Sequence, residues 1–206
     1  MLKIWGRKNS SNVKKVLWCA EELNIPYQQV DAGGSFGKLN DPEYRALNPN
    51  GLVPTIQDGD FVLWESNSIL RYLASQYGNA SLYPADNRKR AKVEQWMDWT
   101  AGSFAIPFRD LIFNLIRRTE DERDHAALEA GKERCKELFT LADKALSQTP
   151  YLAGETFSLA DIAFGPFAYV WLELPIERPA LPYLTAWYER MKQRPAFNQI
   201  VRIPIT

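Results

Sequence analysis

The first 78 residues alternate between short strand patterns and amphipathic helix patterns. Strand patterns occupy residues 2–5, 27–30, 53–57 and 61–64, and the last two flank an Asp-Gly turn typical of a β-hairpin. Helical spacing fills the segments between and after them, which gives the order β-α-β-α-β-β-α. This order predicts a mixed sheet with helices packed on its faces.

The rest of the chain has helical periodicity. Its features are a polar connection at residues 80–87, a long helix from Arg88, a charged helical stretch at 119–146 and a final helix at 183–193. Ser158 and Asp161 form a capping-box pattern before an apolar run, which predicts a buried helix. We therefore predict an α/β domain over residues 1–79, a linker over 80–87 and an all-α domain over 88–206.

Charge and composition narrow the classes of partner. Lys plus Arg and Asp plus Glu each total 25, so no net charge favours nucleic acid or an anionic membrane. The sequence has no secretory signal pattern and no apolar run long enough to span a bilayer. Cys19 and Cys135 match neither a metal site nor a disulfide framework. We expect a cytoplasmic protein with free thiols and no metal.

The turn between the first strand and the first helix contains Ser10, Ser11 and Asn12. Proteins with a thioredoxin-like domain place a Cys-x-x-Cys pair here, but Ser10 and Val13 occupy those positions, so dithiol exchange is not expected. A hydroxyl at a helix N-terminus can instead stabilise an anion, including the thiolate of a ligand. Lowering a thiol pKa from ~8.5 to ~6.5 requires about 2.7 kcal/mol, which one charge-assisted hydrogen bond can supply. Taken alone, the triplet is better explained by ordinary helix capping.

Two further motifs suggest recognition of a peptide-like ligand. Pro54 at the start of a strand leaves the backbone groups of Val53 free to pair with an extended peptide. Glu65 can bind an ammonium group, while the Ser66 hydroxyl and the following helix N-terminus can bind a carboxylate. Each motif alone is also explained as a strand entry or a helix cap. Together with a thiolate stabiliser, they describe a site for a ligand such as glutathione.

Four sequence blocks carry a resemblance to a known family. They lie at residues 10–16, 48–54, 65–73 and 158–162, and they resemble the signature blocks of cytosolic glutathione S-transferases, in particular bacterial theta/phi-like members. The resemblance covers essentially the whole chain. It implies a thioredoxin-like N-terminal domain, a helical C-terminal domain, a homodimer and glutathione as co-substrate. The tyrosine used by other classes is absent, because Trp5 stands near the end of the first strand.

The resemblance also implies roles for individual residues. The Val53–Pro54 bond would be cis, the Val53 backbone would pair with the cysteinyl part of glutathione, and Glu65 and Ser66 would bind its γ-glutamyl end. Ser10 matches the catalytic serine, and Asn12 is the second candidate for contact with the sulfur. Lys38 is a candidate for the glycyl carboxylate, or else a solvated lysine.

The second substrate is expected to be a small electrophile. Among the aromatic residues at helical spacing, one or two of Phe104, Phe108 and Phe113 are expected to face it, and the others to belong to the core. The function predicted is activation of the glutathione thiol for attack on this electrophile. The alternative is a non-catalytic glutathione-binding or scaffold protein with the same fold.

Overall fold

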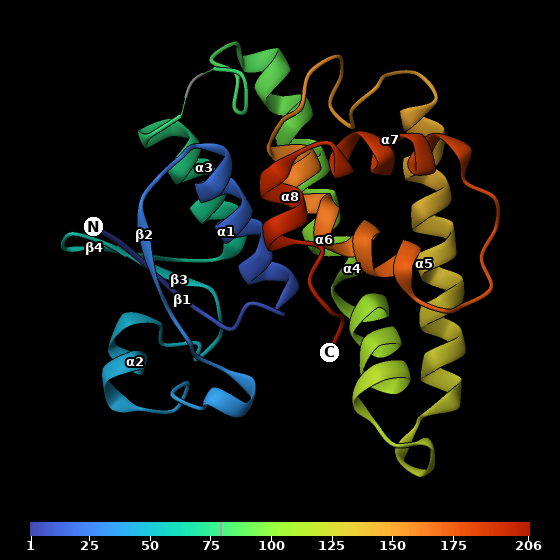
Figure 1. Cartoon of the computed structure of the whole chain (residues 1–206), viewed down its shortest axis with the longest axis horizontal. Helices are drawn as coiled ribbons and strands as arrows, with labels where there is room; N and C mark the ends of the chain where they lie inside the picture. Colours follow the sequence, from blue (N-terminus) through green and yellow to red (C-terminus); the bar gives the residue numbers. More distant parts are fainter. Residues whose placement is uncertain (79) are drawn as a thin grey trace.

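The computed structural model describes residues 1–78 and 80–206 and consists of a small α/β part and a larger helical part (Figure 1). The domain boundary expected at residue 79 lies outside the described residues. The first helix of the helical part, α4, begins at Asn87, the last residue of the expected linker.

Four short strands form a mixed sheet in the order β2-β1-β3-β4. Their bounds are β1 Leu2–Trp5, β2 Tyr27–Val30, β3 Thr55–Asp58 and β4 Phe61–Trp64. β1 pairs in parallel with β2 and antiparallel with β3, which forms the predicted hairpin with β4. Ile4 lies opposite Ile56 in this pairing, and both are fully buried. The predicted mixed sheet is therefore confirmed.

The third strand begins later than the expected start at residue 53. Pro54 has no N–H to donate to a neighbouring strand, so the ladder starts at Thr55. Residues 53 and 54 remain outside the sheet, and the peptide bond between them is cis, as the resemblance implies.

Three helices accompany the sheet: α1 (Ser11–Glu22), α2 (Pro42–Leu47) and α3 (Ser66–Gln76). A 3₁₀ turn, Gly34–Phe36, precedes α2. α1 and α3 contact each other and lie above the sheet in Figure 1, with α1 next to the helical part, whereas α2 lies below the sheet. Gly6 makes the turn into α1 possible: its φ is 149°, and a Cβ there would overlap Val13 and come within 3.3 Å of Val53 Cβ.

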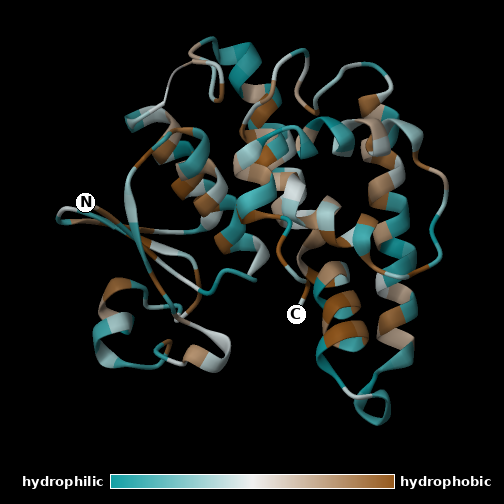
Figure 2. Ribbon diagram, in the orientation of Figure 1, coloured by the Kyte–Doolittle hydropathy of each residue, from teal (hydrophilic) through white to brown (hydrophobic). Residues whose placement is uncertain are grey.

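The helical part contains α4 (Asn87–Ile112), α5 (His125–Leu146), α6 (Leu159–Glu173), α7 (Pro182–Lys192) and α8 (Pro195–Ile200). A π-helical turn, Phe113–Arg117, and a 3₁₀ turn, Glu120–Glu122, connect α4 to α5. Hydrophobic residues are concentrated in the C-terminal part of α4 (Figure 2). The charged stretch expected at 119–146 is helical in α5 only from His125, and α8 was not predicted.

The central helix α6 is buried as its apolar sequence predicts. The predicted capping box is present: Ser158 Oγ accepts from Ala160 N, and Asp161 accepts from Ser158 N at 3.0 Å. The Asp161 carboxylate also accepts from Trp187 Nε1 at 2.8 Å. Gly165 lets α1 approach α6, because a Cβ there would lie 2.5 Å from the Trp18 ring. α6 thus fixes α1, and with it the turn that contains Ser10.

Candidate active site

Two cavities adjoin the N-terminus of α1, and Asn12 lines both of them. The smaller has a volume of about 60 Å³ and is lined by residues of the α/β part. The larger has a volume of about 280 Å³ and lies between the α1 N-terminus, α4 and α6, next to the C-terminal residues Ile205 and Thr206. A ligand spanning Asn12 could therefore occupy the smaller cavity and present a reactive group to the larger one.

Ser10 occupies the N-cap position of α1, but its side chain makes no capping hydrogen bond. Its backbone carbonyl accepts from Lys14 N at 2.9 Å, as a first helical hydrogen bond requires. The side chain lines the larger cavity together with Ser11 and Asn12. Simple helix capping, the explanation favoured by the sequence alone, therefore does not account for the Ser10 hydroxyl.

The smaller cavity brings together four of the predicted binding residues, Val53, Pro54, Glu65 and Ser66. Ser66 is the first residue of α3 and is only 8% exposed. Glu65 precedes the helix with a φ of 74°, a left-handed conformation that is costly for a residue with a Cβ. A carboxylate and a helix N-terminus thus lie side by side, which suits the ammonium and carboxylate groups of an α-amino acid.

Sequence reasoning missed four further residues of the smaller cavity, Asn48, Asn50, Leu52 and Trp64. Asn48 is 2% exposed and donates from Nδ2 to Leu52 O at 2.9 Å, while its Oδ1 accepts from Asn50 N at 3.0 Å. This amide therefore holds the turn before Val53 in place. The dense turn cluster at residues 48–51 was the available signal.

The aromatic residues predicted for the electrophile pocket separate into two groups. Phe108 and Phe113 line the larger cavity. Phe104 does not line it: this side chain is 0% exposed and packs against the rings of Phe139, Phe164 and Phe167, with centroids 5.0–5.9 Å apart. Phe104 is therefore a core residue, and the expectation that one or two of the three rings face the substrate stays a prediction for Phe108 and Phe113.

Lys38 lies in neither cavity lining. It follows the 3₁₀ turn with a φ of 70° and is exposed. The sequence analysis assigned no role to the basic residues of the larger cavity, Arg7, Lys14, Arg109 and Arg117, although Lys14 lies in the block at residues 10–16.

Two lysines of α1 are buried beside the site. Lys14 is 3% exposed, donates to Val201 O at 2.8 Å, and has its pKa lowered to about 8 by burial. Lys15 is 1% exposed and its Nζ lies 4.8 Å from the Phe167 ring centroid. Burial lowers the pKa of Lys15 to about 7, although attraction by Glu65 opposes this shift.

Within residues 1–78 and 80–206, no group of three or more His, Cys, Asp or Glu side chains is arranged to bind a metal ion. No helix in the same residues combines the length and the apolar character needed to cross a membrane. Cys19 and Cys135 are both free and buried.

The structure is that of a two-domain protein, a thioredoxin-like domain followed by a helical domain, with two adjoining cavities at the N-terminus of α1. The family model described as glutathione S-transferase, N-terminal domain, matches residues 9–76, and that for the C-terminal domain matches residues 73–195. The chain therefore belongs to the glutathione S-transferase family. Its activity is that of a glutathione transferase.

Relatives agree with this assignment over the full length. The chain is 42% identical over 208 residues to glutathione S-transferase GstB of Escherichia coli, with 100% of both chains covered. Glutathione S-transferase F14 of Arabidopsis thaliana is 35% identical over 96% of this chain and 80% of its own length. A glutathione-bound theta class glutathione S-transferase from Xanthomonas axonopodis pv. citri superposes with a TM-score of 0.96 and 53% identity, covering 100% and 99% of the two chains. The expected resemblance to bacterial theta/phi-like members, including glutathione S-transferase B of enteric bacteria, is confirmed.

Proposed function

We propose that this transferase binds glutathione in the smaller cavity and activates its thiol beside Ser10. The observation that supports this role is the Ser10 hydroxyl, which is at the α1 N-terminus, lines the larger cavity and makes no capping bond. Donation from Oγ to the sulfur, together with the helix dipole, favours the thiolate over the thiol. A decrease of the thiol pKa by ~2 units requires about 2.7 kcal/mol, within the range of one such hydrogen bond plus the dipole.

Glutathione is oriented by the remaining predicted binding residues. Glu65 binds the γ-glutamyl ammonium, and the Ser66 hydroxyl with the α3 N-terminus binds the γ-glutamyl carboxylate. The backbone of Val53, next to the cis bond, pairs with the cysteinyl part. Lys38, which lies outside both cavity linings, is the candidate for the glycyl carboxylate, or else a solvated lysine. The glutathione-bound relative from Xanthomonas axonopodis supports glutathione as the ligand.

Asn12 is the second candidate for contact with the sulfur. Ser66 Oγ donates to Asn12 Oδ1 at 3.4 Å, a long hydrogen bond that is given up when the single Ser66 hydroxyl proton is donated to the γ-glutamyl carboxylate. In either arrangement Asn12 Nδ2 is available to a ligand. Because Asn12 lines both cavities, a donor there can reach a sulfur that lies between them.

The electrophile binds in the larger cavity, against Phe108 and Phe113. The protein accelerates the reaction by activating the nucleophile and holding the two reactants together. We further propose that the enzyme works as a cytoplasmic homodimer without a metal.

Replacing Ser10 by alanine tests this assignment. Steady-state conjugation of glutathione to 1-chloro-2,4-dinitrobenzene should show a kcat ~10–100-fold lower, with KM for glutathione changed less than ~3-fold, because Oγ acts on the thiolate. Ser147→Ala, a hydroxyl removal at the end of α5, is the matched control and should keep full activity. Unchanged turnover in Ser10→Ala with lost turnover in Asn12→Ala would move the catalytic role to Asn12.

A further inference from the structure

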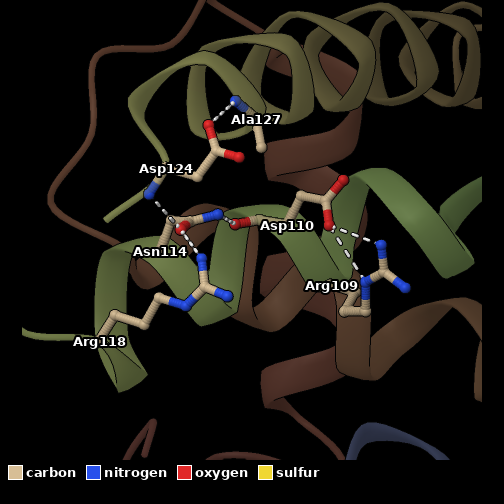
Figure 3. Close-up of polar contacts among 6 residues, drawn as sticks. All are labelled: Arg109, Asp110, Asn114, Arg118, Asp124 and Ala127. Atoms are coloured by element: carbon tan, nitrogen blue, oxygen red, sulfur yellow. Dashed lines mark hydrogen bonds and ion pairs between the residues drawn. The ribbon is translucent and has the colours of Figure 1, made fainter. Parts of the chain in front are cut away.

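Buried side-chain networks hold the walls of both cavities. In the helical part, the buried Asn114 donates from Nδ2 to Asp110 O at 2.8 Å. Its Oδ1 accepts from Arg118 Nη1 at 2.8 Å and from Asp124 N at 2.9 Å (Figure 3). This network ties the end of α4 to the start of α5 and lies within the helical part. A second network, in the α/β part, reaches the backbone that we propose binds glutathione.

The second network is centred on the hydroxyl of Tyr44, a residue of α2. Tyr44 is 2% exposed, and its partner Thr55 is 0% exposed. Tyr44 Oη lies 2.6 Å from Leu52 O and 3.0 Å from Thr55 Oγ1. In the sequence, Leu52 and Thr55 enclose Val53 and Pro54, which line the smaller cavity. A single hydroxyl therefore contacts the chain on both sides of this pair.

The donors and acceptors of this network match one another. The only hydroxyl proton of Tyr44 is donated to Leu52 O, so Tyr44 Oη is the acceptor for the Thr55 hydroxyl. The two protons of Asn48 Nδ2 are donated to Leu52 O at 2.9 Å and to Thr55 Oγ1 at 3.0 Å. Burial raises the pKa of Tyr44, so the phenol keeps its proton near neutral pH. A buried network in which every proton has an acceptor favours a single geometry.

The Tyr44 ring is itself held by the sheet. It packs edge-to-face against Trp5, with ring centroids 5.8 Å apart. Trp5 pairs with Thr55 in the ladder between β1 and β3. The hydroxyl is therefore positioned by two strands, and Leu52 O is held relative to the sheet.

Leu52 O and the Val53 N–H belong to the same peptide unit. This unit is planar and trans, so its oxygen and its N–H point in opposite directions. Holding Leu52 O at Tyr44 Oη therefore aims the Val53 N–H away from that hydroxyl. Val53 lines the smaller cavity, whereas Tyr44 does not. Among the described residues no backbone acceptor pairs with the Val53 N–H, which leaves it to a carbonyl of a ligand.

We propose that Tyr44 is a positioning residue for glutathione: through Leu52, its hydroxyl directs the Val53 N–H to the cysteinyl carbonyl of the ligand. The inference rests on the proposed function and adds to it how the binding backbone is held. Tyr44 does not touch glutathione in this account. It acts on binding of the peptide and not on the sulfur.

Tyr44→Phe removes only the hydroxyl. Asn48 still donates to Leu52 O, so the variant loses one of two hydrogen bonds to this carbonyl. KM for glutathione should rise ~3–10-fold, while kcat at saturating glutathione should stay within ~2-fold because Ser10 is unaffected. Steady-state conjugation to 1-chloro-2,4-dinitrobenzene measures both.

Two thioamide isomers of glutathione test the direction of the Val53 N–H itself. In the cysteinyl isomer sulfur replaces the cysteinyl carbonyl oxygen, and in the γ-glutamyl isomer it replaces the γ-glutamyl carbonyl oxygen. A thioamide sulfur is a weaker acceptor than an amide oxygen, so the cysteinyl isomer alone weakens the proposed bond. In titration calorimetry with the wild type, the cysteinyl isomer should bind ~5–10-fold more weakly than the γ-glutamyl isomer. In Tyr44→Phe this ratio should fall to ~2-fold or less, because the N–H is no longer aimed at the ligand.

Two controls separate positioning from general stability. Tyr72→Phe removes another hydroxyl of the α/β part, which donates to Asp58 Oδ2 at 2.8 Å. Asn114→Ala breaks the network of Figure 3. Both variants should keep the wild-type ratio of the two isomers. If Tyr44→Phe weakens both isomers equally and keeps that ratio, Tyr44 only supports the fold and the inference is overturned.

The wild-type ratio also separates this inference from the proposed function. Equal binding of the two isomers by the wild type would refute the pairing of Val53 with the cysteinyl part, and the role of Tyr44 with it. A wild-type preference that Tyr44→Phe retains would leave the pairing in place and refute the role of Tyr44 alone. Circular dichroism checks folding. If Tyr44→Phe is unfolded, Thr55→Val removes the hydroxyl that donates to Tyr44 and should lower the ratio in the same direction.

Discussion

Ser66 Oγ donates a hydrogen bond to Asn12 Oδ1 at 3.4 Å, joining the first residue of α3 to the first turn of α1. The two residues are 54 positions apart in sequence. Asn12 lines both cavities, so this contact links the proposed glutathione subsite to the proposed electrophile subsite. The single Ser66 hydroxyl proton serves either Asn12 or a ligand carboxylate, so binding of glutathione would exchange this link between the helices for a contact with the ligand.

Ser66→Ala should raise the Kd of glutathione by ~10-fold and leave kcat within ~3-fold, because the lost hydroxyl contacts the γ-glutamyl carboxylate and not the sulfur. Titration calorimetry with glutathione and steady-state kinetics measure the two effects separately. Ser68→Ala, on the same helix but lining neither cavity, is the control. A drop in kcat with unchanged affinity would instead place Ser66 in the chemical step.

Phe104→Ala should mainly lower stability, whereas Phe113→Ala should mainly weaken binding of the electrophile. Phe104 is fully buried, so its replacement by alanine should lower the free energy of unfolding, measured by urea denaturation, by ~3–5 kcal/mol. Phe113 is 41% exposed, so its removal should cost less than ~1 kcal/mol but raise KM for the electrophile several-fold. A large stability loss in Phe113→Ala with unchanged KM would show that this ring supports the fold and does not contact substrate.

The features that the sequence predicted correctly are those that depend on residues close together in the chain. The strands, the Asp-Gly hairpin and the capping box of Ser158 and Asp161 each follow from residues close together in the chain, and all are present. Glu65 and Ser66 are proposed as a binding pair from the sequence because their complementary chemistry lies in two adjacent residues. Their common cavity with Val53 followed only from the resemblance.

The missed features depend on packing between distant segments. Phe104 and Phe108 lie one helical turn apart on α4, so helical periodicity places them on the same face of the helix. The sequence does not show that α6 packs over Phe104 and buries its ring. Arg7 and Arg117 are 110 residues apart and belong to different parts of the protein, and the π-helical turn has no sequence signature. The basic cavity therefore becomes visible only in the folded chain.

The free energy of unfolding should rise with pH above 7 because of Lys15. The pKa of Lys15 is about 7 in the folded protein and 10.5 in the unfolded chain, so between these pH values the unfolded chain binds more protons. Raising the pH removes the protons that favour the unfolded chain, and the free energy of unfolding therefore increases. Lys15→Met removes this ionisation. Its stability advantage over the wild type should therefore shrink by ~3 kcal/mol between pH 7 and pH 9.5.

Urea denaturation at several pH values measures this difference, and Lys14→Met should show a smaller effect that begins near pH 8. Exposed Lys89→Met is the control. A difference between Lys15→Met and wild type that is constant over this pH range would mean that Lys15 is solvated in the folded protein.

The most direct test of the account is the thiol pKa of bound glutathione, followed by ultraviolet difference absorbance of the thiolate against pH. We expect a pKa ~2 units below the free value of ~8.5 in the wild type, and a value within ~1 unit of the free thiol in Ser10→Ala. A bound thiol with an unshifted pKa in the wild type would contradict thiolate activation at this site.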